Sequence, residues 1–153
     1  MVLRELTTHA DDEALVEVVS EDIGHVDMYG NVVSSKYLTT DAAATARSSD
    51  SGELRLGIWD TDTFVGMISS RLGVSKKEAE IEYWLRASAI GRGYATLAVE
   101  AITKYLAPKY KRLFAEVHVE HQKSADVLVR VGYHLIGEVE RDWGRALIFE
   151  LRK

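Results

Sequence analysis

Residues 85–96 read Leu-Arg-Ala-Ser-Ala-Ile-Gly-Arg-Gly-Tyr-Ala-Thr and join a predicted strand to a predicted helix. The strand is predicted at 78–85, where polar and apolar residues alternate from 78 to 83. The helix is predicted because apolar residues then repeat at helical spacing until Pro108 ends the pattern. Its apolar face consists of Ala95, Ala98, Val99, Ile102, Tyr105 and Leu106. A helix that opens from such a loop presents unpaired backbone N–H groups at the positive end of its dipole, so the segment predicts a phosphate or diphosphate site.

Two glycines allow this loop to approach a ligand closely. Gly91 and Gly93 accept positive φ and carry no side chain, Ala95 keeps the first helical turn narrow, and Arg92 adds a positive charge. The alternative interpretation is a tight turn that merely precedes a helix. A dinucleotide-binding fingerprint would require a third glycine where Thr96 stands, and a P-loop would require Gly-Lys-Ser/Thr, which the chain lacks.

Patterns outside this segment predict an α/β (α+β) chain. Strands are predicted at 2–7, 54–59, 64–68, 78–85, 113–119, 133–140 and 146–151. Helices are predicted from about residue 11, at 33–46, at 95–106, and from about Ser124 to a glycine cap at Gly132. Short polar turns join the three central strands into an antiparallel meander, and the last two strands form a hairpin. We therefore expect a mixed, mostly antiparallel sheet, with residues 1–153 in a single domain.

The composition is that of an ordinary globular domain, with 153 residues, 46% hydrophobic and 28% charged. The net charge of −5 argues against a surface built on positive charge, so no direct nucleic-acid binding is expected. Apolar runs are much shorter than the ~18 residues of a membrane span, and no secretory leader is visible, so no membrane association is expected. The chain has no cysteine, which removes cysteine nucleophiles and thiolate ligands and fits a cytoplasmic protein.

The glycine loop resembles a known cofactor motif. Residues 90–95 resemble the acetyl-CoA signature of the GNAT superfamily of N-acetyltransferases, written Gln/Arg-x-x-Gly-x-Gly/Ala. Gly93 and Ala95 match its last two fixed positions, and Ile90 stands where glutamine or arginine is usual. The backbone cradle for the diphosphate does not depend on the side chain at that position.

A second segment strengthens the resemblance. Residues 121–133 resemble the family's Asn-x-x-Ser-x-x-Val-Leu-x-x-x-Gly-Phe pattern, with His121 at the asparagine position, Ser124 at the serine and Tyr133 at the phenylalanine. The serine is typical of the branch that contains the ribosomal-protein N-terminal (alanine) acetyltransferases. The resemblance covers roughly residues 53–140.

This resemblance implies a fold with helices on both faces of the sheet and a splay between its fourth and fifth strands, 78–85 and 112–119, where acetyl-CoA binds as cosubstrate. The diphosphate would meet the amides of 91–95, and pantetheine would run along 83–85 like an added strand. The implied cofactor contacts are Tyr83, Trp84, Leu85, Ile90, Gly91, Arg92, Gly93, Tyr94, Ala95, Thr96, His121 and Ser124. No metal is implied.

The chemistry needs a proton donor for the leaving thiolate of coenzyme A. The nearest branch implies Ser124 for this role, and the alternative role of that residue is a helix N-cap. Many family members use a tyrosine in the same helix, and Val129 is aligned with it.

The chemistry also needs an unprotonated amine. Glu80 and Glu82 share one face of their strand and are the candidate bases, with solvated edge carboxylates as the alternative. Glu116 and His118 share the polar face of the opposite strand and offer a base that acts through water. A backbone N–H of 83–85 would stabilise the oxyanion.

These features predict an N-acetyltransferase that transfers acetyl to a primary amine by direct attack in a ternary complex. A protein or peptide N-terminal α-amine is preferred over a small-molecule amine, and residues 21–50 and 140–146 would form the acceptor pocket. The alternative is a catalytically inactive module that binds coenzyme A and serves as a sensor or partner. A monomer is compatible with the sequence, and an exposed edge at 146–151 would allow a homodimer.

Overall fold

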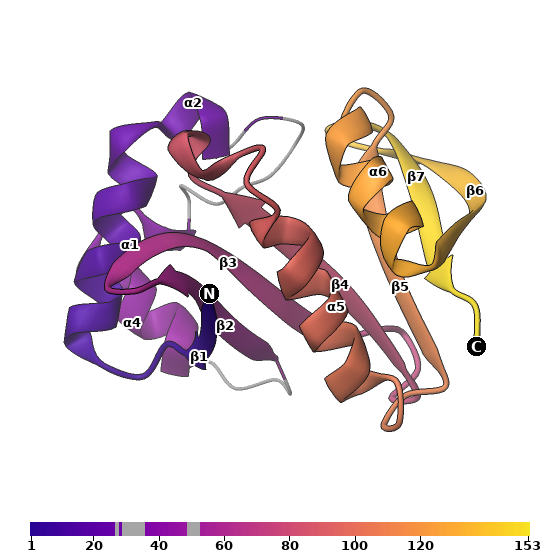
Figure 1. Cartoon of the computed structure of the whole chain (residues 1–153), viewed down its shortest axis with the longest axis horizontal. Helices are drawn as coiled ribbons and strands as arrows, with labels where there is room; N and C mark the ends of the chain where they lie inside the picture. The colour runs from indigo at the N-terminus through magenta and orange to yellow at the C-terminus, as the bar shows by residue number, and fades with distance from the viewer. Residues whose placement is uncertain (27, 29–35, 49–52) are drawn as a thin grey trace.

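A computed structural model gives the structure of the chain and describes residues 1–26, 28, 36–48 and 53–153. These residues build a seven-stranded sheet with the order β1-β2-β3-β4-β5-β7-β6 (Figure 1). Its strands are β1 Val2–Glu5, β2 Leu54–Asp60, β3 Thr63–Leu72, β4 Glu78–Leu85, β5 Arg112–His118, β6 Tyr133–Arg141 and β7 Gly144–Leu151. Neighbouring strands are antiparallel except for the parallel pair β4 and β5. The mixed, mostly antiparallel sheet is confirmed.

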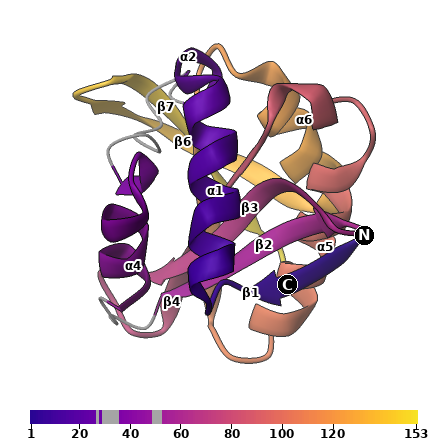
Figure 2. The same cartoon turned by 90° about the vertical axis from the view of Figure 1, so that its left-hand side faces the viewer.

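Helices cover both faces of this sheet, as expected. They are α1 His9–Glu21, α2 Ile23–Val26, α4 Thr40–Ser48, α5 Tyr94–Leu106 and α6 Gln122–Val131, with a 3-10 turn at Ala87–Ala89. Helices α1 and α4 lie across one face (Figure 2) and share a core cluster with Trp59, Phe64 and Trp84. Helices α5 and α6 pack on the other face over Ile68, Ile81 and Leu113. No helix in the described part of the chain is long and apolar enough to cross a membrane.

The splay between β4 and β5 is confirmed by the pairing of these strands. The pairs are Glu78 with Arg112, Ala79 with Leu113 and Glu80 with Phe114, and none follows over the rest of β4 and β5, both fully described. Beyond Phe114 the two strands diverge (Figure 1). The edge of β4 after Glu80 is therefore left without a strand neighbour on the β5 side.

Two sequence-based expectations are corrected. The helix predicted at 33–46 is interrupted. Residues 36 and 37 are helical, residues 38 and 39 form a bend, and α4 extends from Thr40 to Ser48, with the Thr39 hydroxyl accepting the backbone N–H of Ala42 as a cap. Residues 33–35 of that prediction lie outside the described residues. The segment 146–151 is not an edge, because β7 lies between β5 and β6, and the exposed edge belongs to β6.

The first turn of α1 is closed by a reciprocal cap. The Thr8 hydroxyl accepts the Asp11 N–H at 3.2 Å, and the Asp11 carboxylate accepts the N–H groups of Thr7 at 2.8 Å and Thr8 at 3.0 Å. Arg4 donates to the same carboxylate at 2.6 Å. Burial alone would raise the pKa of Asp11, but these donors outweigh it and lower that pKa.

Replacing Asp11 with alanine is expected to lower the free energy of unfolding at pH 7 by about 1–2 kcal/mol. Because the pKa of Asp11 is depressed in the folded state, its contribution is present above the unfolded value of about 3.8 and is lost as the pH falls through the lower folded value. Urea unfolding at pH 7 and near pH 3 checks this. The exposed Glu13→Ala variant should change stability by less than ~0.5 kcal/mol, and an equal loss for Asp11→Ala at both pH values would contradict the linkage.

Candidate active site

The loop before α5 has the geometry that its glycines predicted. Gly91 has φ +80° and Gly93 has φ +85°, in the left-handed region that favours glycine. Gly93 is the N-cap of α5, and its carbonyl accepts the first helical hydrogen bond from Leu97 at 3.2 Å. A Cβ at either glycine would meet nothing within 4 Å, so space is open above the loop. The first N–H groups of α5 therefore face an accessible region.

A cavity of about 530 Å³ opens above this loop. The end of β4, the loop, one side of α6 and residues of α2 form its walls. Ten of the predicted cofactor contacts line it: Tyr83, Trp84, Leu85, Ile90, Gly91, Gly93, Ala95, Thr96, His121 and Ser124. Residues that are distant in sequence are thus gathered around one space.

The side chains of Arg92 and Tyr94 lie apart from this cavity lining. The Tyr94 hydroxyl donates to the Asp60 carboxylate at the end of β2. Arg92 approaches the same carboxylate at 3.8 Å and lies over the Tyr94 ring at 5.3 Å. These two residues thus support the loop through Asp60, and only their backbone amides belong to the predicted cradle.

Ser124 and Tyr83 form a hydrogen-bonded pair between α6 and β4. The Ser124 hydroxyl donates to the Tyr83 hydroxyl at 2.8 Å, and the Tyr83 hydroxyl donates to the Ser124 backbone carbonyl at 3.0 Å. Burial raises the pKa of Tyr83, so this hydroxyl stays protonated at neutral pH. The pair bridges the sheet and α6 close to the point where β4 and β5 diverge.

Two interpretations of α6 are corrected. The N-cap is His121 and the helix begins at Gln122, so Ser124 is its third residue and does not cap it. Val129 is 59% exposed on the outer face of α6 and does not line the cavity above the loop, so a tyrosine there would not face that cavity. The adjacent Leu128 is fully buried, because the helix turns its apolar face to the sheet.

A second cavity, of about 840 Å³, lies on the opposite face of β4. Alternation along the strand sends Glu80, Glu82 and Trp84 to this side and Tyr83 toward α6. The two cavities share four lining residues, Tyr83, Trp84, His121 and Ser124. They therefore meet at the splay, which is where a cofactor from one face could react with a molecule bound on the other.

The comparisons with known proteins agree with this geometry. The family model for the acetyltransferase (GNAT) domain matches residues 1–134. The chain belongs to this GNAT family. The expectation of an N-acetyltransferase is thereby confirmed, and acetyl-CoA is the cosubstrate that membership implies. A search of curated proteins finds no match for the GNAT chain.

Several solved structures share this fold. Mycobacterium smegmatis RimJ in complex with CoA-disulfide has 22% identity and a TM-score of 0.81, over 97% of this chain and 80% of that one. Ribosomal-protein-S5-alanine acetyltransferase from Vibrio fischeri has 16% identity and a TM-score of 0.81, over 97% and 90%. The spermidine N-acetyltransferase SpeG F149A mutant from Vibrio cholerae has 13% identity and a TM-score of 0.75, over 99% and 94%. The GNAT fold is confirmed.

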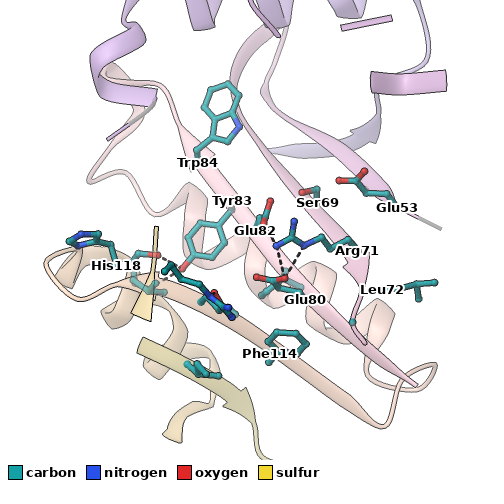
Figure 3. A pocket seen from close by; sticks show the side chains of 18 of the residues that line it. Glu53, Ser69, Arg71, Leu72, Glu80, Glu82, Tyr83, Trp84, Phe114 and His118 are labelled. Atoms are coloured by element: carbon teal, nitrogen blue, oxygen red, sulfur yellow. Dashed lines mark hydrogen bonds and ion pairs between the residues drawn. The ribbon is translucent and has the colours of Figure 1, made fainter. Parts of the chain in front are cut away.

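An arginine separates the two candidate bases of this acetyltransferase. Arg71 donates through Nε to Glu80 at 2.8 Å and lies 3.1 Å from Glu82, so it reaches between the two carboxylates (Figure 3). Glu80 is buried, which raises its pKa, and Arg71 opposes this effect. The Glu82 side chain is 44% exposed. Both candidate carboxylates are therefore already charge-compensated.

Replacing Arg71 with methionine is expected to lower the free energy of unfolding by about 1–3 kcal/mol at pH 8, because Glu80 keeps its burial and loses its cation. The folded pKa of Glu80 should then rise further above its unfolded value, so the native state binds the extra proton and loses stability as the pH rises. Denaturant unfolding should thus show a smaller loss at pH 5 than at pH 8. The exposed Arg152→Met variant is the control, and a loss independent of pH would contradict this role of Arg71.

Other carboxylates that line the cavity of about 840 Å³ are also paired. Arg141 forms an ion pair with Glu116, and Arg112 lies 3.5 Å from Glu78. Residues 21–50 and 140–146 were predicted to form the acceptor pocket. Of these, the described residues that line this cavity are Lys36, Tyr37, Arg141 and Trp143. Residues 27, 29–35 and 49–50 of those ranges lie outside the described residues. No cluster of three metal-ligating side chains occurs within the described ranges.

Three basic or titratable residues that line the cavity of about 530 Å³ were missed by sequence reasoning. His25 of α2 contacts the Leu85 carbonyl at 2.8 Å and so fixes α2 at the end of β4. Arg130 donates to the Thr96 hydroxyl at 3.1 Å across the mouth of the cavity, and Lys123 lines the same wall. Lys123 and Arg130 are seven residues apart in α6 and so share a face. This spacing is the sequence pattern from which the two basic residues could have been predicted to line one wall.

Proposed function

We propose that this GNAT protein binds acetyl-CoA in the cavity of about 530 Å³, the cofactor cavity, and a primary amine in the cavity of about 840 Å³, the acceptor cavity. The acetyl group then passes directly from acetyl-CoA to the amine. The meeting of the two cavities at Tyr83 and Ser124 is the observation that carries the proposal. Direct attack needs both substrates bound at once, and two connected sites on opposite faces of one strand suit a ternary complex.

For the cofactor, we place the diphosphate on the amides that follow Gly91 and open α5. Lys123 and Arg130 supply positive charge on the facing wall. Pantetheine then follows the free edge of β4 from Leu85 toward Tyr83, as an added strand would. This direction carries the thioester to the junction of the cavities, and a backbone N–H of the same edge is the proposed oxyanion donor.

The departing thiolate needs a proton, and Ser124 is the proposed donor. In the structure its hydroxyl points to Tyr83, so it must rotate to face a sulfur atom in the cofactor cavity. The Tyr83 hydroxyl then donates to the Ser124 Oγ instead of to the Ser124 backbone carbonyl. The Ser124 hydroxyl oxygen therefore still accepts a hydrogen bond while its proton faces the sulfur. Glu80 and Glu82 are already ion-paired with Arg71, so neither carboxylate is proposed as the base.

For the acceptor, we propose a peptide N-terminal α-amine. A polyamine needs several unpaired carboxylates, whereas Glu80 and Glu82 are held by Arg71 and Glu116 by Arg141. A cavity of about 840 Å³ has room for the first residues of a peptide. An α-amine has a pKa of about 8 against about 10.4 for lysine, so its deprotonation costs roughly 3 kcal/mol less.

The test is thiol release from acetyl-CoA with a panel of amines at pH 7.5. We expect turnover with peptides that have a free N-terminus and none with the same peptides acetylated at that position. Spermidine and a peptide whose only amine is a lysine side chain should be at least ~10-fold slower in kcat/KM. Binding of coenzyme A without turnover on any amine would instead support the sensor module.

A further inference from the structure

The carboxylate of Asp60 contacts the side chains of both neighbours of Gly93 in the cofactor loop. Asp60 is the last residue of β2 and does not line the cofactor cavity. Its Oδ2 accepts the hydrogen bond of the Tyr94 hydroxyl and lies 3.8 Å from Nη2 of Arg92. The Arg92 guanidinium in turn lies over the Tyr94 ring, 5.3 Å from its centroid. One carboxylate of the sheet thus holds the chain on either side of the N-cap of α5.

The backbone between these side chains needs such a restraint. Glycine has more backbone conformations available than any other residue, and both Gly91 and Gly93 have positive φ in the structure. The Tyr94 ring is packed in the core under α5, so this residue is fixed at its ring and at its hydroxyl. Holding both neighbours of Gly93 keeps the first amides of α5 in place before a ligand arrives, which reduces the entropy lost on binding.

The two links to Asp60 differ in strength. Tyr94 is 8% exposed and donates to a charged acceptor, and such a hydrogen bond is stronger than one between neutral groups. The side chains of Arg92 and Asp60 are 59% and 41% exposed, and an ion pair in that setting contributes little. The hydrogen bond of the Tyr94 hydroxyl is therefore the main restraint, and the charge of Arg92 adds a smaller one.

We propose that Asp60 is a positioning residue for coenzyme A, an inference that rests on the proposed function. Its carboxylate acts through Tyr94 and Arg92, which keep the amides that follow Gly91 aligned with the diphosphate. The thioester lies at the junction of the two cavities, which β4 and α6 form without Asp60. The affinity for the cofactor should thus depend on this carboxylate, whereas the rate of acetyl transfer in the ternary complex should not.

Asp60→Ala tests this assignment. Kd for coenzyme A, measured by calorimetry, should rise by roughly 5- to 30-fold, and KM for acetyl-CoA should rise by a similar factor, while kcat at saturating acetyl-CoA stays within ~2-fold of the wild type. Asp60→Asn keeps an oxygen that accepts the Tyr94 hydrogen bond, so its Kd should rise by less than ~5-fold. Asp62→Ala, at an exposed position of the same turn, is the matched control and should bind as the wild type does. Thermal unfolding without ligand shows which variants are folded.

Tyr94→Phe shows whether the tyrosine acts through Asp60, because it removes only the hydroxyl. It should raise Kd by roughly 3- to 10-fold, also where Asp60→Ala does not fold. Added to a folded Asp60→Ala protein, it should raise Kd no further, because the two groups form one link.

Wild-type Kd in folded Asp60→Ala or in Tyr94→Phe would overturn the assignment, as would a loss confined to kcat or losses that add in the double variant. A wild-type protein that does not bind coenzyme A would instead overturn the proposed function.

Discussion

Gly93→Glu is expected to abolish coenzyme A binding, with a Kd at least ~100-fold above that of the wild type, or ~2.7 kcal/mol. Gly93 has φ +85°, which costs a residue with a Cβ about 1–2 kcal/mol. The new carboxylate also stands at the N-terminus of α5, where the amides assigned to the diphosphate begin. A fixed negative charge there repels the cofactor's phosphates and competes for the same donors.

Isothermal titration with coenzyme A measures this effect, and thermal unfolding without ligand shows that the variant is folded. Gly93→Asn is the matched control, because asparagine tolerates the left-handed region and brings no charge. We expect its Kd to stay within ~10-fold of the wild type. A folded Gly93→Glu protein that binds coenzyme A as tightly as the wild type would place the diphosphate elsewhere.

Local patterns were enough to predict β4, the glycine loop, α5 and α6 around the cofactor cavity, but not α2, whose His25 and Val26 also line it. The apolar repeat from Ala95 to Leu106 gave α5 within a residue at either end, and Gly132 ends α6 with φ +113°. These features depend on neighbouring residues along the chain, which the sequence displays directly. The splay between β4 and β5 is a long-range property, and it was predictable only because the motifs resemble a family.

The parts that escaped prediction depend on contacts between distant residues. Arg71 precedes Glu80 by nine residues, but only the pairing of β3 with β4 places it between Glu80 and Glu82. Tyr83 and Ser124 are separated by 41 residues, so nothing in the chain order shows that their hydroxyls meet. The position of β7 inside the sheet follows from its pairing with β5, whereas alternation alone is the same for edge and inner strands.

Ser124→Ala is expected to lower kcat by about 100-fold at pH 7, because the leaving thiolate loses its proton donor. Kd for coenzyme A should change less than ~3-fold, since the diphosphate and pantetheine are held by backbone groups of the loop and β4. Steady-state thiol release with a peptide α-amine gives kcat, and calorimetry gives Kd. Ser124→Thr retains a hydroxyl and should recover at least ~10-fold of the lost rate.

Tyr83→Phe separates the roles of the two hydroxyls. If Ser124 is the donor and Tyr83 only orients it, Tyr83→Phe should reduce kcat by about 3- to 10-fold, well short of the Ser124→Ala effect. In that case Tyr83 acts only through Ser124. The variant that combines Tyr83→Phe with Ser124→Ala should then have a kcat no lower than that of Ser124→Ala alone. A nearly inactive Tyr83→Phe beside an active Ser124→Ala would assign the acid to Tyr83, which is protonated at neutral pH because burial raises its pKa.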